Sequence, residues 1–146
     1  MEKIKIKLMR KSSKSPTYAS CGAAGADIYA DIAEVIEIPP HRTELISSGF
    51  AIEIPMGYCG LVYPRSGMAS KRGLAPANKV GVIDSDYRGE VMVAMHNHSD
   101  FFALVYPGER IAQLVIAPVL TPGFEVCDEL SDTVRGEGGF GSTGEK

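Results

Sequence analysis

The sequence contains no hydrophobic run that approaches the roughly 18 consecutive apolar residues of a membrane-spanning helix. The first residues, MEKIKIKLMRK, alternate charged and aliphatic side chains and lack the apolar stretch of a secretory signal. They predict a strand whose lysines suit the edge of a sheet. We therefore expect no membrane partner and a cytoplasmic location, or a nuclear one if the source is eukaryotic.

The sequence also contains few cysteines and has a small net charge. Cys21, Cys59 and Cys127 are far apart and form no C-x-x-C pair. An odd number of widely spaced cysteines is typical of reduced thiols and disfavours a disulfide framework or a zinc site. The net charge of −3 disfavours a nucleic-acid partner, which would require a basic face. A small anionic ligand is compatible with this charge where basic side chains gather locally.

The composition fits neither disorder nor long helices. Hydrophobic residues make up 45% and charged residues 23% of the 146 residues, near the averages for one globular domain. Sixteen glycines and nine prolines separate short apolar runs, which favours many strands. The predicted fold is all-β, a jelly-roll-like sandwich or distorted barrel with one short helix. We expect strands over residues 3–8, 35–38, 44–54, 59–63, 91–95, 101–106, 111–116 and 124–130.

The stretch Gly81–Glu90, GVIDSDYRGE, carries polar side chains between two apolar runs and predicts a β-hairpin. Asp84 directly follows Ile83, where a buried strand would emerge, so we expect a partly desolvated carboxylate held by rigid backbone. Those are the properties of a general base. Tyr87 adds a flat ring suited to lying against a sugar or base. The alternative is a plain soluble turn.

The stretch Pro64–Gly73, PRSGMASKRG, predicts the one substantial helix. We expect Ser66 to cap its N-terminus and Gly67 to leave room for close approach of a ligand. Together with the Arg65 guanidinium, such a helix start could bind an anion. The alternative is a short capped helix whose arginine faces solvent.

Three further polar features stand in otherwise apolar surroundings. Asp27 lies among short side chains in AGADIYA, either as a strand-end carboxylate or in a site that a ligand approaches closely. Gln113 interrupts an apolar strand, so its amide needs backbone partners or a ligand. His96 and His98 would share one face of a strand, but no third metal ligand stands at a recognisable spacing.

The last stretch, RGEGGFGSTGEK, begins at Arg135 and is too rich in glycine to pack a core. We expect a β domain over residues 1–134, followed by a mobile arm over residues 135–146. The arm holds an arginine, a phenylalanine and a Ser-Thr pair, which could cover a nucleotide. It is not a P-loop, because no lysine precedes the Ser-Thr pair. The alternative is a disordered tail.

Five stretches, in order, resemble the motifs of the trimeric deoxyuridine triphosphatase (dUTPase) family: AGADIYA, PRSGMA, GVIDSDYRGE, GERIAQL and RGEGGFGSTG. The departures are small: Glu109 stands where aspartate is common, and Ile28 where leucine is more usual. The resemblance implies a jelly-roll homotrimer with active sites at subunit contacts, which hydrolyses dUTP to dUMP and pyrophosphate with Mg²⁺. Such an enzyme keeps uracil out of DNA and supplies dUMP for thymidylate synthesis.

The resemblance also implies roles for individual residues. Asp84 would be the catalytic base that orients and deprotonates the attacking water. Tyr87 would stack beneath the deoxyribose and leave no room for a 2′-hydroxyl. Asn78 and the backbone of Gly81 and Val82 would read the uracil edge.

Other residues of the family motifs would serve the phosphates. Arg65, Ser66 and Gly67 would hold them, as would Gln113. Arg65 and Gln113 are also expected among the catalytic residues. Asp27 would help to hold Mg²⁺, through water.

The glycine-rich arm would close over the substrate. Phe140 would stack on uracil, and Arg135, Ser142 and Thr143 would reach the phosphates. Gly141 belongs to the same substrate-binding stretch.

Three other functions compete with this interpretation. A deoxycytidine triphosphate deaminase on the same scaffold would need a group, typically a glutamate, that activates water against the base, whereas this chain offers Asp84 and Tyr87. A nucleotide-sensing protein would bind dUTP without hydrolysis, which an intact Asp84 and Arg65 argue against. A β-sandwich interaction module would share the five motifs only by coincidence.

Overall fold

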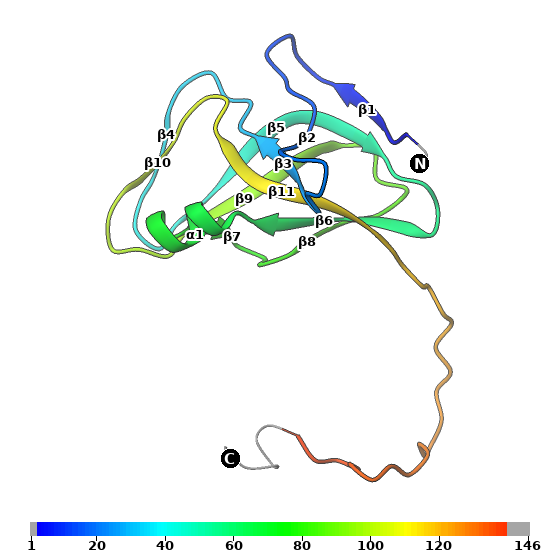
Figure 1. Cartoon of the computed structure of the whole chain (residues 1–146). Coiled ribbons are helices and arrows are strands. Elements are labelled where there is room, and N and C mark those ends of the chain that lie inside the picture. The colour runs from blue at the N-terminus through cyan, green and yellow to red at the C-terminus, as the bar shows by residue number, and fades with distance from the viewer. Residues whose placement is uncertain (1–2, 140–146) are drawn as a thin grey trace.

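The structure is a computed structural model, and it describes residues 3–139. Short strands make up most of its regular structure, with one helix (Figure 1). The elements are β1 (Lys5–Leu8), β2 (Thr17–Tyr18), β3 (Ala26–Tyr29), β4 (Ile36–Ile38), β5 (Thr43–Glu53), β6 (Tyr58–Pro64), α1 (Ser66–Arg72), β7 (Leu74–Pro76), β8 (Gly81–Ile83), β9 (Glu90–Asn97), β10 (Ala103–Val105) and β11 (Arg110–Pro118).

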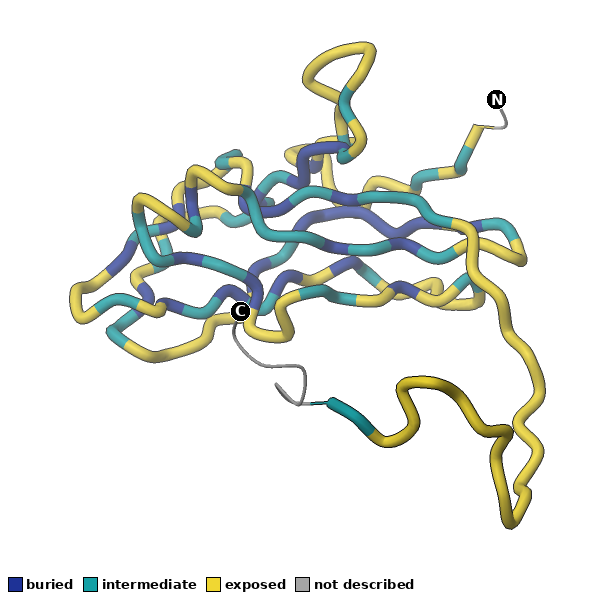
Figure 2. The backbone as a smooth tube through the Cα atoms, turned by 60° about the horizontal axis from the view of Figure 1, so that its bottom comes forward, coloured by how far each residue is buried: buried dark blue, intermediate teal, exposed yellow. Residues whose placement is uncertain are grey.

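Antiparallel pairing joins the strands into two larger sheets and a two-stranded ribbon. The sheets have the orders β1-β5-β9-β7 and β2-β3-β11-β6-β8, and the ribbon is β10-β4. The two larger sheets lie one over the other, and the most buried positions run between them (Figure 2). The predicted all-β sandwich with one short helix is therefore confirmed. Seven of the eight predicted strands are present, with bounds that shift by a few residues.

Side chains that alternate along the strands form the core. In β9, Val91, Val93 and Met95 point inward and are buried, whereas Met92 between them is exposed. Asn97 continues the inward series, and its buried amide donates to the carbonyl oxygens of Ile38 at 2.9 Å and of Phe101 at 2.7 Å. Within residues 3–139, no helix is long and apolar enough to span a membrane.

The predicted hairpin at Gly81–Glu90 is wrong. β8 pairs with β6 in one sheet, whereas β9 pairs with β5 and β7 in the other. The 84–89 loop therefore crosses from one sheet to the other. An apolar–polar–apolar pattern fits both a hairpin and a loop that crosses between sheets, because each needs buried residues on either side of the polar stretch. Here these buried residues are Ile83 and Val91. Which arrangement forms depends on strand pairing with distant parts of the chain.

The predicted helix is present as α1, but its start differs from the expectation. Arg65 occupies the N-cap position without a side-chain capping hydrogen bond, and Ser66 is the first helical residue. The end follows the usual rule for helix termini. Gly73 adopts the left-handed conformation (φ 64°), and its amide donates to the carbonyl oxygen of Met68.

The predicted strand over residues 124–130 is also wrong. Residues 119–139 contain no helix or strand, and Figure 1 shows this segment running outside the sheets. Its large apolar side chains are almost fully exposed, including Phe124 at 98% and Val126 at 99%. The sequence has strand-like residues here, but a strand needs a pairing partner, and this segment has none among residues 3–139.

An ion-pair network, here called the Arg10 network, ties the loop after β1 to the start of β9. The Arg10 guanidinium donates to Asp31 from Nε at 2.7 Å and to Glu90 from Nη2 at 2.6 Å. Glu90 also accepts from Ser47 Oγ and from the Gly49 amide at 2.8 Å. Gly49 sits in a bulge of β5 at φ 75°, where a Cβ would lie 2.1 Å from Asp31 Oδ2.

These contacts shift the acidity of both carboxyl groups. Burial acts to raise the pKa of Glu90, but hydrogen bonds from Arg10, Ser47 and the Gly49 amide outweigh it and hold that pKa below its ordinary value. The pKa of Asp31 is lowered in the same way, against burial, by hydroxyl groups and Arg10. Both groups therefore favour their charged forms in the folded chain.

Replacing Arg10 by methionine should lower the free energy of unfolding near neutral pH by about 1–2 kcal/mol, since two carboxylates lose a partner that solvent partly screens. Carboxyls with a lowered folded pKa stabilise the fold above their unfolded pKa of about 4, and this contribution is lost as the pH falls through the folded pKa. The difference between the two proteins should therefore stay constant down to about pH 5 and shrink below it. Urea unfolding across pH measures it. A difference that persists unchanged in acid would contradict the assignment.

Candidate functional site

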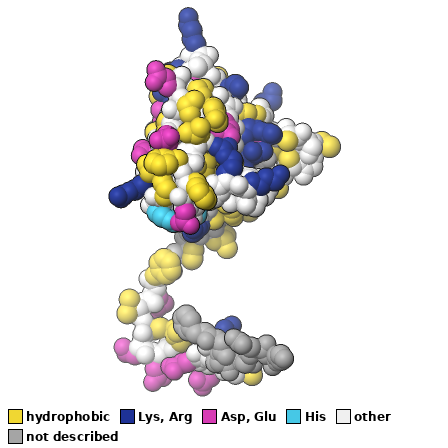
Figure 3. Space-filling view, turned by 90° about the vertical axis from the view of Figure 1, so that its left-hand side faces the viewer, with side chains coloured by type: hydrophobic (Ala, Val, Ile, Leu, Met, Phe, Trp, Pro, Cys, Tyr) yellow, Lys and Arg dark blue, Asp and Glu magenta, His cyan; other side chains and the backbone are white. Residues whose placement is uncertain are grey.

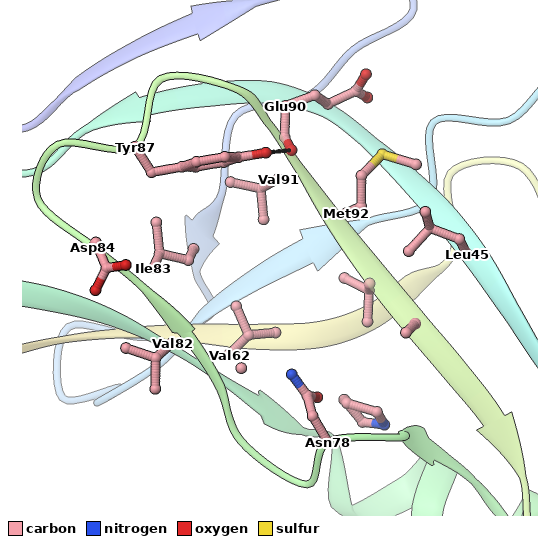
Figure 4. A pocket seen from close by; sticks show the side chains of 14 residues that line it. Leu45, Val62, Asn78, Val82, Ile83, Asp84, Tyr87, Glu90, Val91 and Met92 are labelled. Atoms are coloured by element: carbon pink, nitrogen blue, oxygen red, sulfur yellow. Dashed lines mark hydrogen bonds between the residues drawn. The ribbon is translucent and has the colours of Figure 1, made fainter.

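A pocket of about 270 Å³ opens between β8 and β9, where the two sheets separate. This inter-sheet pocket has an apolar floor and a polar rim (Figure 4). The lining residues are Leu45, Val62, Pro76, Asn78, Gly81, Val82, Ile83, Asp84, Tyr87, Glu90, Val91, Met92, Val93 and Ala94. A concave apolar space with a few polar groups is the usual form of a small-molecule site.

Tyr87 lies across the pocket and is held at its hydroxyl end. Its hydroxyl donates to the carbonyl oxygen of Glu90 at 2.9 Å. Its ring lies against Gly89, where a Cβ would come within 2.4 Å of the hydroxyl oxygen. Figure 4 shows the ring extending above Ile83 and Val91. The ring therefore offers a flat face at a defined height over the pocket.

Asp84 stands at the rim of the pocket, immediately after β8. It is exposed, so the expected partial burial is not found in the single chain. The turn that follows is closed by a hydrogen bond from the Tyr87 amide to the Asp84 carbonyl oxygen at 3.2 Å. This bond fixes the backbone that carries the carboxylate. Water has free access to the Asp84 side chain.

Asn78, Gly81 and Val82 complete the rim on the opposite side. Asn78 lies in the turn between β7 and β8, and this turn places Lys79 at φ 64°. The Asn78 amide nitrogen would lie 3.2 Å from a Cβ at Gly81, so the glycine lets the side-chain amide approach the strand backbone closely. The sequence-predicted residues Asn78, Gly81, Val82, Asp84 and Tyr87 thus share one pocket.

A second group of predicted residues gathers around Asp27, here called the Asp27 cluster. Asp27 is buried in β3, and its Oδ1 accepts from Arg65 Nε at 2.8 Å. Its Oδ2 accepts from Arg110 Nη1 at 3.0 Å. Gln113 is the cross-strand neighbour of Asp27, and its side-chain amide donates to the Pro64 carbonyl oxygen at 2.9 Å. Of the two alternatives for Gln113, a backbone partner or a ligand, the structure shows the backbone partner.

Positive charge is concentrated near this cluster. α1 starts directly after Arg65 and carries Lys71 and Arg72 in its last turn. Figure 3 shows Lys and Arg side chains gathered on the end of the molecule that carries α1, beside exposed hydrophobic groups. Ser66 and Gly67 are exposed at the start of the helix. The acidic chain thus has a local basic surface.

The single chain does not bring all of the predicted residues together. The inter-sheet pocket is lined by neither Asp27, Arg65 nor Gln113. Arg135 is exposed in the segment after β11, where its Nε donates to the Gly138 carbonyl oxygen at 2.7 Å. The predicted arm residues Phe140, Gly141, Ser142 and Thr143 lie outside the described residues.

A pocket with a tyrosine ring across it and an acid at its rim, on a chain that also carries a basic surface elsewhere, is compatible with a nucleotide ligand. Comparison with known proteins identifies the family. The family model described as dUTPase matches residues 11–144. The chain belongs to the dUTPase family. A deoxyuridine 5′-triphosphate nucleotidohydrolase of Desulfitobacterium hafniense is 50% identical over 145 residues, which are 97% of this chain and 96% of that one. The enzyme of the same name from Hydrogenobaculum sp. is 46% identical over 99% of each chain.

Solved dUTPase structures share the fold. The dUTPase of Staphylococcus bacteriophage 80alpha, in a mutant form with dUpNHpp, has a TM-score of 0.86 and 31% identity over 99% of each chain. A mutant dUTPase from phage phi11 of S. aureus has a TM-score of 0.77 and 27% identity over 88% of this chain and 98% of that one. The description of that phage protein names a structural Mg(II) ion.

In this dUTPase-family chain, residues 3–139 contain no group of three or more His, Cys, Asp or Glu side chains that could hold a metal ion. His96 and His98 lie with their ring centroids 4.4 Å apart, and His96 Nδ1 is bonded to Thr43 Oγ1 at 2.9 Å. Both carboxylate oxygens of Asp27 already accept from guanidinium groups.

Two residues of the site were missed by reasoning from the sequence. Arg110 lies within GERIAQL and contacts Asp27, because antiparallel pairing of β11 with β3 brings the two strands together. Its place within a family motif was a signal that could have found it. Glu90 closes the GVIDSDYRGE stretch and bonds to Tyr87 through its carbonyl oxygen, a contact that side-chain patterns do not reveal.

Replacing Asp27 by asparagine should lower the free energy of unfolding by about 1–3 kcal/mol, because two guanidinium groups lose a buried anionic acceptor. Asp100→Asn is the matched control, since the Asp100 side chain is 87% exposed and its one side-chain partner within residues 3–139 is His41 Nε2, at 2.9 Å. The control should stay within about 0.5 kcal/mol of the parent. Urea unfolding of the three proteins measures both effects. Equal stability of Asp27→Asn and Asp100→Asn would contradict a structural role for the cluster.

Proposed function

We propose that this chain hydrolyses dUTP to dUMP and pyrophosphate, by attack of water on the α-phosphate. Its membership of the dUTPase family and its 50% identity to a named deoxyuridine 5′-triphosphate nucleotidohydrolase support the proposal. The observation that carries the mechanism is the inter-sheet pocket, with Tyr87 across it and Asp84 at its rim. The reaction keeps uracil out of DNA and supplies dUMP for thymidylate synthesis. We expect it to take place in the cytoplasm.

Asp84 is the catalytic base in this proposal. A general base must stand within hydrogen-bond reach of the attacking water, and Asp84 lies at the rim where the pocket meets solvent. The hydrogen bond between the Tyr87 amide and the Asp84 carbonyl oxygen holds its backbone. The carboxylate takes a proton from water while the oxygen of that water forms its bond to the α-phosphorus. The bond from the α-phosphorus to the pyrophosphate oxygen breaks on the opposite side.

The nucleoside occupies the inter-sheet pocket in this proposal. The Tyr87 ring stacks against the deoxyribose and leaves no room for a 2′-hydroxyl. Asn78 and the backbone of Gly81 and Val82 face the uracil edge, where a donor and an acceptor are needed to read a pyrimidine. The apolar floor beneath a polar rim supports this placement, because it suits a flat base and a sugar.

The phosphates lie along the Asp27 cluster and the start of α1. A nucleoside triphosphate carries about four negative charges, so a protein with a net charge of −3 needs a focused positive site. Arg65 is oriented by Asp27 and supplies donors for phosphate oxygens, with Ser66 and Gly67 beside it. Gln113 lies on the neighbouring strand and offers an amide. Arginine charge stabilises the leaving pyrophosphate.

Magnesium fits this site only as a partner of the substrate phosphates. Mg²⁺ in nucleotide sites usually keeps several waters and takes one or two carboxylates. The Asp27 oxygens already accept from Arg65 and Arg110, which is compatible with a contact through water and not with a direct protein cage. When bound, the ion would neutralise charge on the leaving group. Within this chain, Asp27 is the residue that would orient its water shell.

A homotrimer with active sites at subunit contacts accounts for the separation of the two residue groups. The pocket and the Asp27 cluster could then be completed by different subunits. The apolar side chains after β11 support association, because monomeric proteins rarely leave so many large groups uncovered. Those exposed by 88% or more are Leu120, Phe124, Val126, Leu130 and Val134. The arm over residues 135–146 would close each site, with Arg135, Phe140, Gly141, Ser142 and Thr143 on the substrate.

The test is incubation of the purified chain with dUTP, UTP, dTTP and dCTP in the presence of Mg²⁺, following pyrophosphate and ammonia. We expect pyrophosphate from dUTP, much less from the other three nucleotides, and no ammonia. Ammonia from dCTP would support a deaminase instead. Binding of dUTP without pyrophosphate release would identify a nucleotide-sensing protein and refute the proposal.

Replacing Asp84 by asparagine should lower kcat by roughly 10²–10⁴-fold, the range for a lost general base, while dUTP still binds. The matched control is Asp86→Asn in the same loop, because Asp86 does not line the pocket. Steady-state kinetics and calorimetric titration with dUTP separate turnover from binding. Near-parental kcat for Asp84→Asn would exclude the role as a base.

A further inference from the structure

Glu90 contacts two different parts of the site at once. Its backbone carbonyl oxygen accepts the hydroxyl of Tyr87 at 2.9 Å, inside the inter-sheet pocket. Its carboxylate points away from the pocket (Figure 4) and accepts from Arg10, Ser47 and the Gly49 amide. One residue thus joins the ring over the pocket to the Arg10 network outside it. The two contacts lie on opposite sides of the same backbone.

The network behind Glu90 is anchored in distant parts of the chain. Arg10 bridges Glu90 and Asp31, and Asp31 also accepts from Ser13 Oγ at 2.7 Å. The side chains of Asp31 and Glu90 are only 6% and 21% exposed, whereas that of Arg10 is 44% exposed, so solvent reaches the bridge mainly from the arginine side. These contacts hold the first residue of β9 against the loop after β1 and the bulge of β5.

The Tyr87 ring has few other supports. The 84–89 loop lies between strands of different sheets, so no strand ladder runs along it. The ring lies directly on the backbone at Gly89, where a Cβ would stand 2.6 Å from the ring carbon that bears the hydroxyl. A shift of the backbone at residues 89–90 therefore displaces the ring itself. The position of Glu90 decides the height of the ring over the pocket.

We propose that the Arg10–Glu90 ion pair positions the Tyr87 ring and thereby sets how strongly the site discriminates against a 2′-hydroxyl. Arg10 and Glu90 are positioning residues that act through Tyr87, and neither side chain contacts the sugar. The proposal rests on the function proposed above, because it assigns the Tyr87 ring to the deoxyribose. A loosened ring admits the larger sugar, so selectivity falls before turnover of dUTP does.

The kinetic selectivity of variants for dUTP over UTP tests the positioning role of the Arg10–Glu90 ion pair. The ratio of kcat/KM for dUTP to that for UTP is measured for the parent, Arg10→Met, Glu90→Gln and Tyr87→Phe. Arg10→Met should lower the ratio by about fivefold to tenfold, the effect of one lost hydrogen bond, and Tyr87→Phe by a similar factor. Glu90→Gln keeps an acceptor for Ser47 and the Gly49 amide, so it should lower the ratio less. An unchanged ratio in Arg10→Met would overturn the proposal.

Glu53→Ala is the matched control. It removes another ion pair of the sheet, in which Lys5 Nζ lies 2.9 Å from the Glu53 carboxylate, and it leaves Glu90 and the pocket lining untouched. Its ratio should equal that of the parent. A drop as large as that of Arg10→Met would assign the effect to general loosening of the sheet edge and overturn the proposal.

A double-mutant cycle separates action through Tyr87 from an independent effect. If Arg10 acts through the bond from Tyr87 to Glu90, the double variant Arg10→Met/Tyr87→Phe should have a ratio close to that of the single variants. If the reductions in the ratio caused by the two single substitutions multiply in the double variant, Arg10 acts by another route and the proposal is overturned.

Hydrogen exchange tests the positioning without any substrate. In Arg10→Met and Glu90→Gln, amides of residues 85–91 should exchange about tenfold faster than in the parent and in Glu53→Ala, while amides of β11 stay unchanged. Exchange at the parental rate would overturn the positioning role even if the chain hydrolyses dUTP. Failure of the parent to hydrolyse dUTP would refute the proposed function, and exchange would still report whether the network orders the loop.

Discussion

The site depends on how the chain satisfies its backbone hydrogen bonds on either side of residues 84–89. β8 pairs with β6 at the edge of one sheet, and β9 pairs with β5 and β7 inside the other. Each strand thus has backbone partners in its own sheet, and the two consecutive strands can diverge. A pocket opens between them, and its floor consists of the same side chains that close the core, Ile83 and Val91.

In this arrangement the chain passes from the rigid core to the polar rim of the pocket within a few residues. Ile83 is buried, and the next residue, Asp84, is exposed at the rim. The backbone position of the carboxylate is therefore set by packing, while the carboxylate stays open to water. A general base that takes a proton from water needs a fixed backbone and an accessible carboxylate more than it needs burial. The exposed Asp84 of the single chain is consistent with the role of such a base. Desolvation, where the mechanism needs it, has to come from whatever closes over the pocket.

The Asp27 cluster holds two arginine side chains in defined orientations on an acidic protein. A free arginine side chain would sample many conformations and lose that entropy on binding. Asp27 takes Nε of Arg65, and the Arg110 carbonyl oxygen takes Nη1 at 3.3 Å, so two contacts orient the guanidinium. Nη2 lies outside both contacts. The conformational entropy of the Arg65 side chain is therefore lost when the chain folds, and less of it remains to be lost when a ligand binds.

Local patterns predicted much of this molecule, and long-range pairing accounts for the failures. The seven correct strands, the helix before Gly73 and the set of motif residues that line one pocket all follow from short motifs. Residues 124–130 look like a strand in isolation, yet they have no partner within residues 3–139. Ser66 looks like a helix cap, but the helix starts one residue too early for that role. Arg10 and Glu90 are 80 residues apart, so no local pattern could pair them.

An ion pair is the kind of anchor that the start of β9 requires. An apolar anchor of similar strength would have to be buried, and the inner face of β9 is already occupied by side chains of the core and the pocket lining, such as Val91 and Val93. The Arg10 network instead acts from the outer side of the backbone, through a carboxylate that turns away from the pocket. Its strength comes from several charge-assisted bonds on partly buried groups, which hold better than an exposed pair. The network can therefore hold the Tyr87 ring in place without filling the pocket beneath it.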